Sequence, residues 1–252
     1  PYPPSYHITE VHRILKRVSG IKVPFKELRQ ACNKMGVEIA RRLSSRFPGR
    51  PSQKEFTRLV KWAIAGNVLD FRTVGTGYGL GVERIQPLLE EKVKEGLKVD
   101  DTPKLYQNLK KGGKKILYVL DNVGEIALDK LLMEKINLLG NEVITCLRGG
   151  PITSDATFED GEEVNLFRSP VKVILAGPDT LGISWREKSA ILSRTIKEVD
   201  IIITKGQANY YVFSQYRAEI PGRVFCLFTT KCDSVSEKFG FKGKINLAVE
   251  VR

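Results

Sequence analysis

The segment ILYVLDNVGEIALDKLL, Ile116 to Leu132, joins an uninterrupted apolar run to the start of an amphipathic helix. The run, Ile116 to Leu120, ends directly in Asp121 and Asn122. A solid apolar run, rather than an alternating one, is typical of a strand buried on both faces of a parallel sheet. The segment therefore predicts a β-strand followed at once by a helix, with an acid and an amide at the junction.

The same pattern recurs through the rest of the C-terminal part. Short apolar runs separated by helices and loops occur at 115–120, 142–147, 171–176, 199–204 and 223–228. They predict a doubly wound, Rossmann-like α/β fold, in which a mostly parallel sheet lies between two layers of helices.

Up to about Lys111 the apolar spacing is helical instead. Ile8, Val11, Ile14, Leu15 and Val18 follow this spacing, and Ser52 with Glu55 forms the pattern of a capping box at the start of a later helix. We expect an all-helical N-terminal domain over residues 1–111 and an α/β domain over 112–252, with the boundary at KKGGKK.

Length and composition indicate a globular protein. The chain has 252 residues, 42% of them hydrophobic and 28% charged, which suffices for one sizeable core or for a main domain plus a smaller one. No apolar run approaches the roughly 20 residues needed to cross a bilayer, and no secretory leader is visible. A cytoplasmic location without membrane association is therefore expected.

The net charge of +12 is concentrated near the N-terminus. Residues 1–50 hold 11 Lys or Arg against 3 Asp or Glu, whereas the remainder holds 30 against 26. Nucleic-acid binding is one explanation. A solvated helical surface with a basic bias is favoured, because no aromatic stacking pattern accompanies the charges.

The four cysteines have no close paired spacing. Cys146 and Cys226 fall inside apolar runs, and Cys32 and Cys232 stand alone. Buried free thiols are favoured over a zinc site or disulfides.

Small, polar and charged residues follow every predicted strand. These segments are Asp121-Asn122, Arg148 to Thr157, Gly177 to Thr180, Lys205 to Asn209 and Thr229 to Asp233. Ligands of open α/β sheets bind in the crevice outside the carboxyl ends of the strands, so the five segments are expected to converge there.

The residue types at this edge suit a phosphate site with a metal ion. Asp121, Asn122 and Asp155 offer the oxygen ligands that Mg²⁺ or Mn²⁺ prefers. Lys205 and Lys231 supply positive charge, and Gly149, Gly150 and Gly206 allow backbone amides to approach an oxyanion. The two histidines, His7 and His12, lie far upstream, which argues against a zinc site and against a Ser-His-Asp triad.

Each of these residues also has a structural alternative. Asp121-Asn122 could form a helix N-cap and turn, Asp155 could shape its loop, and the lysines could be surface residues. Asn67 and Asp70 could cap a helix end or face the site. The stretch GTGYGLG, 75–81, follows a helix and lacks the full spacing of a nucleotide-binding loop, so a flexible connection is favoured there.

Several motifs together resemble the metal-dependent damage-control phosphatase family, also known as domain of unknown function eighty-nine. The matching pieces are AGNVLDF, DNVGE, GGPITSDAT, KGQANYY and the Lys231-Cys232 pair, in the family's order over residues 65–232. The helical region ahead of them also fits the family's helical domain.

The resemblance implies hydrolysis of phosphomonoesters of small metabolites, such as sugar phosphates or damaged phosphometabolites, with Mn²⁺, Mg²⁺, Co²⁺ or Ni²⁺. It places the metal on Asp121, Asn122 and Asp155. Asp121, Glu125 and Lys205 are the expected catalytic residues. The expected substrate-binding residues are Asn67, Arg148, Gly206, Gln207, Asn209 and Lys231. Family members usually have Asn at Ser154, Gly at Ala208 and frequently an acid at Tyr211.

The expected mechanism combines metal and cationic side chains around the phosphoryl group, with water or the Asp121 carboxylate as nucleophile. Three rivals stand beside it. A carboxyl methyltransferase would need a Gly-rich turn after the Ile116 strand, which is missing. A basic nucleic-acid-binding protein and a metabolite-binding protein without turnover are the other two.

Overall fold

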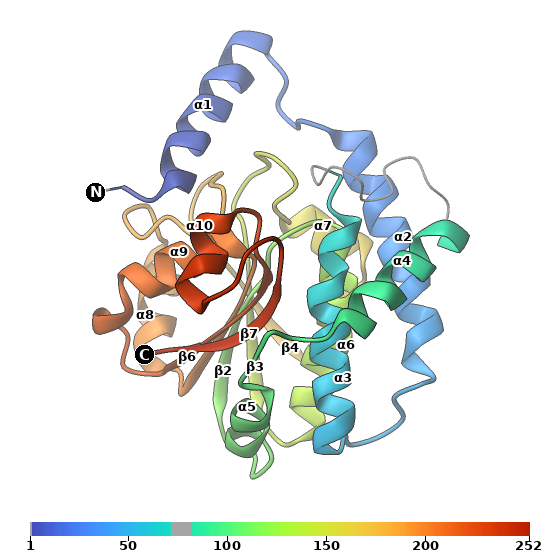
Figure 1. Ribbon diagram of the computed structural model, residues 1–252. Coiled ribbons are helices and arrows are strands. Elements are labelled where there is room, and N and C mark those ends of the chain that lie inside the picture. Colours follow the sequence, from blue (N-terminus) through green and yellow to red (C-terminus); the bar gives the residue numbers. More distant parts are fainter. Residues whose placement is uncertain (1, 72–81) are drawn as a thin grey trace.

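One seven-stranded sheet runs through the centre of the molecule, with helices on both of its faces (Figure 1). The computed structural model describes residues 2–71 and 82–252. The helices are α1 (Pro4–Ser19), α2 (Lys26–Ser44), α3 (Gln53–Ala65), η1 (Gly66–Leu69), α4 (Val82–Glu95), α5 (Thr102–Leu109), α6 (Glu125–Leu138), α7 (Phe158–Glu163), η2 (Leu166–Arg168), α8 (Ala190–Glu198), α9 (Gln207–Gln215), η3 (Arg217–Glu219), α10 (Asp233–Ser236) and η4 (Glu237–Phe239). The strands are β1 (Val99–Asp100), β2 (Lys115–Val119), β3 (Glu142–Leu147), β4 (Val171–Leu175), β5 (Ile201–Lys205), β6 (Arg223–Thr229) and β7 (Asn246–Val251).

The strand order is β1-β7-β6-β5-β2-β3-β4, and every neighbouring pair is parallel except β6 with β7. Val119 at the end of β2 lies beside Cys146 of β3 and Thr204 of β5. Because these three central strands end in register, the loops that follow them start side by side at one edge of the sheet.

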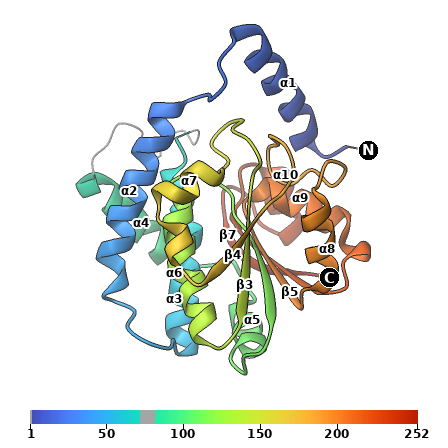
Figure 2. The same ribbon diagram turned by 180° about the vertical axis from the view of Figure 1, so that it is seen from behind.

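Both faces of the sheet are buried, which explains the solid apolar runs. Ile116, Tyr118 and Leu120 share one core with α2, α3, α4, α5 and α6. Leu117 and Val119 point into a second core that contains α8 and α9. Figure 2 shows the same two helical layers from behind. Alternate residues of β2 thus serve opposite layers, and a polar residue inside the strand would disturb one of them.

The doubly wound fold is confirmed, and the five predicted strands agree with the observed ones to within two residues. The apolar pattern did not predict two further strands, β1 and β7. β1 has only two residues, and β7 at its antiparallel position buries just its first three residues. Neither gives the solid apolar run by which the central strands were recognised. The β1 pairing with β7 also brings part of the region 1–111 into the sheet.

The other described elements of residues 1–111 are helices, and the capping box of Ser52 and Glu55 is present. α1 is a helix, but its apolar side is exposed to solvent, whereas Ser5 and Thr9 are buried. Figures 1 and 2 show α1 apart from α2, at the side of the sheet where α9 and α10 lie. Its helical spacing was therefore correctly interpreted, while its polar side is the one that docks.

All four cysteines are free. Cys146 and Cys226 are buried as expected, Cys32 is half-buried, and Cys232 is exposed, contrary to the expectation of four buried thiols. In the part of the chain that the structure describes, no helix combines the length and apolar character of a membrane span. The stretch GTGYGLG lies outside the described residues.

Candidate active site

Asp121 and Asn122 lie at the carboxyl end of β2, where the sequence places them, and both are buried. They do not cap α6. The N-cap residue of that helix is Gly124, and no side chain caps the helix through a hydrogen bond. Asn122 Nδ2 instead donates to Asp121 Oδ2 at 2.8 Å and to Glu125 Oε2 at 3.2 Å. The amide therefore orients two carboxylates.

Asp155 reaches the same place from the loop after β3. Asn122 and Asp155 form an isolated antiparallel bridge, and Ala156 N donates to Asp121 O at 2.8 Å. Ser154 Oγ donates to Asn122 Oδ1 at 2.9 Å. The three residues expected to hold a metal are thus brought together. Ser154, which departs from the usual family residue, bonds to one of them.

Arg148 stands between the two aspartates and is 1% exposed. Its Nε donates to Asp155 Oδ2 at 3.0 Å, and one terminal nitrogen lies 3.7 Å from Asp121 Oδ1. Neither terminal nitrogen of the guanidinium makes a hydrogen bond to residues 2–71 or 82–252, although both are buried. Buried donors without partners are rare and costly, so a water or a ligand that supplies an acceptor would satisfy them.

Lys205 is fully buried at the end of β5 and turns towards α6. Its ammonium donates to Ala63 O at 2.8 Å, to Asp129 Oδ1 at 2.9 Å and to Glu125 Oε1. Asp129 also accepts a hydrogen bond from the Tyr118 hydroxyl at 2.7 Å. All three ammonium hydrogens of Lys205 are therefore engaged inside the protein.

Negative charge exceeds positive charge in this buried region. Burial, with the nearby carboxylates of Asp155 and Glu125, raises the pKa of Asp121 to about 7. Burial also raises the pKa of Glu125 and of Asp129 more than the attraction of Lys205 lowers it. For Lys205, burial disfavours the charged form, but Asp129 and Glu125 outweigh it and raise the pKa.

This charge distribution fits a bound divalent cation. No group of three or more His, Cys, Asp or Glu residues within 2–71 and 82–252 is arranged as a metal site. The candidate ligands Asp121, Asn122 and Asp155 do not form such a group, because only two of them are acids and the third is an amide. Their oxygen atoms are the hard donors that Mg²⁺ and Mn²⁺ bind. Asp121 is the member that lines an open cavity.

The turn between β5 and α9 packs directly against the Asp121 side chain. Gly206 adopts a positive φ of 81°, and a Cβ atom there would overlap the Asp121 carboxylate. Its backbone N–H donates to Leu227 O at 3.2 Å, so Gly206 serves close packing in this structure. Asn209 is buried; its Nδ2 donates to Lys205 O at 2.7 Å and its Oδ1 accepts from Ile183 N at 2.8 Å, which joins α9 to the end of β5 and to the loop that contains Ile183.

The mouth of the site is a cavity of about 270 Å³. Its lining consists of Pro4, Ser5, Ile8, Asp121, Leu181, Gln207, Ala208, Tyr211 and Lys231. Lys231 Nζ lies 3.7 Å from the buried Asp70. Asn67 is half-buried in η1, close in sequence to that aspartate. The structure therefore brings Lys231 and Gln207 to the cavity beside Asp121.

Two residues that shape the site were missed in the sequence. Arg29 donates to Thr153 O at 2.6 Å and to Asp155 O at 2.8 Å, and it pairs with Asp160. Asn33, one turn further along α2, accepts from Gly124 N at 2.8 Å. Both are buried, and with Gly36 they form an i, i+4, i+7 row. The spacing of that row is that of one helical face. Because its residues are polar or small, apolar periodicity did not identify the face as buried.

Comparison with known proteins supports one family over the whole chain. The model of the damage-control phosphatase ARMT1-like domain matches residues 1–245. A protein of Methanocaldococcus jannaschii named as uncharacterized is 34% identical over 94% of this chain and 76% of its own length. A damage-control phosphatase of Archaeoglobus fulgidus is 30% identical over 94% of this chain and 80% of its own.

A solved structure agrees in fold. A domain-of-unknown-function-89 family protein from Pyrococcus horikoshii superposes with a TM-score of 0.83 and 28% identity, covering 97% of this chain and 81% of that chain. Family match, relatives and fold coincide over the residues that build the site. The chain belongs to the damage-control phosphatase ARMT1-like domain family.

Proposed function

We propose that this protein is a metal-dependent phosphatase that hydrolyses phosphomonoesters of small metabolites. The observation that carries the proposal is the buried pair Asp121 and Asp155 with Arg148 between them. The two terminal nitrogens of Arg148 make no hydrogen bond within the described part of the chain. A phosphoryl group offers oxygens to those nitrogens, and a cation balances the carboxylates. The names of the related phosphatases support the same activity.

Asp121, Asn122 and Asp155 are the residues that would hold Mn²⁺, Mg²⁺, Co²⁺ or Ni²⁺. Such an ion would neutralise charge on the phosphoryl group and so stabilise the transition state. Arg148 is suited to bind two phosphoryl oxygens at once, because a guanidinium presents its donors as a planar fork. Lys231 adds positive charge at the mouth.

Lys205 and Glu125 act together. Glu125 accepts from Asn122 Nδ2, and the ammonium of Lys205 holds the other oxygen of that carboxylate. Asn122 is thereby kept with its Oδ1 towards Ser154 and the metal-binding side. In this arrangement Lys205 positions the ligands through Glu125. Direct contact of its ammonium with phosphate would require loss of one of its three present acceptors.

The test is phosphate release from a panel of phosphomonoesters by protein freed of metal with a chelator and then given one divalent ion at a time. We expect no turnover without metal, and recovery with Mn²⁺, Mg²⁺, Co²⁺ or Ni²⁺. An Asp121→Asn protein purified in the same way detects contaminating phosphatases and should remain inactive. Full turnover by metal-free protein, or by the Asn variant, would refute the assignment.

A further inference from the structure

α1 forms one wall of the cavity beside Asp121. Pro4, Ser5 and Ile8 of this helix line it, opposite Gln207, Ala208 and Tyr211 of α9. Ile8 borders this open space and is 44% exposed. A substrate whose phosphoryl group reaches Asp121 through this cavity therefore leaves its organic part beside α1.

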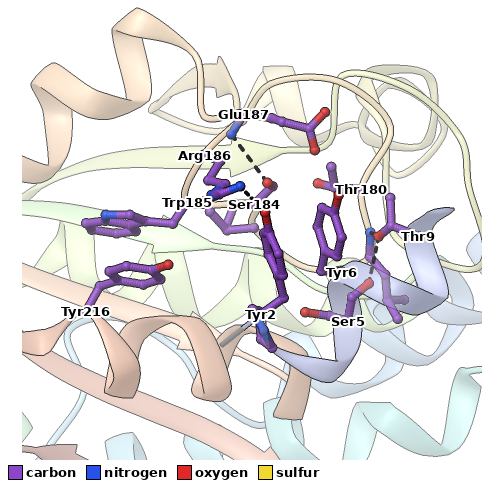
Figure 3. A pocket seen from close by; sticks show the side chains of 13 residues that line it. Tyr2, Ser5, Tyr6, Thr9, Thr180, Ser184, Trp185, Arg186, Glu187 and Tyr216 are labelled. Atoms are coloured by element: carbon purple, nitrogen blue, oxygen red, sulfur yellow. Dashed lines mark hydrogen bonds between the residues drawn. The ribbon is translucent and has the colours of Figure 1, made fainter.

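The N-terminal half of α1 is held on the segment 180–187 (Figure 3). Leu181 N donates to Thr9 Oγ1 at 3.0 Å. The rings of Tyr2 and Tyr6 stack with centroids 4.2 Å apart, and the Arg186 guanidinium lies 4.4 Å from the Tyr2 ring centroid. These contacts fix the part of α1 that carries Ile8.

Ion pairs hold the helix further along. Arg13 contacts Asp179 at 3.1 Å and Glu187 at 3.0 Å. Lys16 contacts Asp179 at 2.5 Å and donates to Pro151 O at 2.8 Å. α1 thus bridges the loops that follow β3 and β4, and its wall has a defined position.

The polar groups that line this cavity are largely paired with the protein. Gln207 donates to the Tyr211 hydroxyl at 2.9 Å, and its carbonyl oxygen accepts from Lys231 N at 2.7 Å. On the α1 side the lining consists of Pro4, Ser5, Ile8 and Leu181, of which only Ser5 is polar. A substrate hydroxyl placed against the side chains of Ile8 and Leu181 would lose hydrogen bonds to water and find no partner on those side chains.

We propose that α1 recognises the organic part of the substrate, and that Ile8 selects phosphomonoesters whose carbon atoms facing it carry hydrogens rather than hydroxyl groups. The inference rests on the proposed function, because it assumes that the phosphoryl group binds at Asp121 and Arg148. It makes Ile8 a specificity residue that takes no part in the chemical step.

Binding is measured by calorimetry on Mn²⁺-loaded protein with hexylphosphonate and ethylphosphonate, which cannot be hydrolysed as esters. A buried methylene changes affinity by about fourfold, so hexylphosphonate should bind at least about tenfold more tightly. Ile8→Thr keeps the β-branched shape but places a hydroxyl on the cavity wall. It should reduce the ratio of the hexylphosphonate affinity to the ethylphosphonate affinity by about 3- to 10-fold. The matched control is Ile14→Thr, the same change at a residue of α1 that is 51% exposed and does not line the cavity.

Turnover provides the second arm, with hexyl phosphate and sorbitol 6-phosphate as substrates of equal carbon number. Ile8→Thr should lower the kcat/KM ratio of hexyl phosphate to sorbitol 6-phosphate, mainly through KM, and Ile14→Thr should not. Equal affinities for the two phosphonates, or equal effects of the two threonine variants, would overturn the proposal. If no phosphomonoester is hydrolysed while the phosphonate ratio depends on Ile8, the proposed phosphatase function fails and the role of α1 stands.

Discussion

At the scale of single residues, Lys205 and Arg148 illustrate how partners determine a role. Both are cations at the carboxyl edge of the sheet, and both are buried. The ammonium of Lys205 has three hydrogen-bond acceptors within the protein, whereas the terminal nitrogens of Arg148 have none among the residues that the structure describes. Arg148 is therefore the better candidate for contact with phosphate, and Lys205 for holding Glu125.

Lys205→Met should strongly destabilise the protein. The substitution leaves Glu125 and Asp129 buried without their cation, and breaking a buried pair in this way costs about 3–5 kcal/mol of the free energy of unfolding. Urea denaturation followed by circular dichroism measures the change. Lys172→Met is the control, since Lys172 pairs with Glu142 at the surface and should lose under about 1 kcal/mol. Similar losses in the two variants would contradict the buried network.

At the scale of elements, α2 and α6 approach each other through glycines. A Cβ atom at Gly36 of α2 would overlap the backbone oxygen of Gly124, the N-cap residue of α6. The same contact places Asn33 within hydrogen-bonding distance of Gly124 N. The position of the Asp121 loop is thus set by how closely two helices pack.

Gly36→Ala should therefore destabilise the fold, although alanine favours a helix. Overpacking a tight contact costs about 1–3 kcal/mol, which exceeds the roughly 1 kcal/mol gained in helix propensity. Thermal and urea unfolding give the measurement. Lys34→Ala, on the exposed side of the same helix, tests for a general response of α2 and should change stability by less than about 0.5 kcal/mol. A stabilised Gly36→Ala protein would show that the two helices can separate without cost.

At the scale of the whole molecule, two hydrophobic cores on opposite faces of the sheet meet at the strands that carry the site. α1 contributes no residue to either core, among the residues described. The fold around the candidate ligands is thus built by the elements from α2 onwards. A ligand of Asp121 and Asp155 is consequently coupled to the stability of the entire sheet.

Divalent metal should raise the melting temperature of the whole protein. A ligand that binds only the folded state stabilises it by about 2.7 kcal/mol at a hundredfold excess over its Kd. Asp121→Asn should reduce this shift and nearly abolish turnover. The metal-free variant should be at least as stable as wild type, because one of several crowded carboxylates has gone.

Thermal melts with and without Mn²⁺ test this expectation. Glu237→Gln removes an exposed carboxylate outside the site and should keep the full shift. An unchanged metal-induced shift in Asp121→Asn would exclude Asp121 as a ligand.

The sequence by itself determined the central strands, the capping box of α3 and the edge at which polar residues gather. These follow from local periodicity and from the rule that parallel strands end at a common edge, so neighbouring residues suffice to infer them. Asp121, Asn122 and Asp155 were therefore expected to meet, and they lie together.

Only the tertiary structure decided which side chains pair. Lys205 contacts Glu125 across 80 positions of the chain, and Arg29 reaches Asp155 across 126. The docking of α1 by its polar side is of the same kind, because Arg13 and Lys16 find Asp179 far along the sequence. Periodicity tells which residues of a helix share a face. It does not tell what that face meets, since the choice between solvent, a core and an opposite charge is made by segments that only folding brings together.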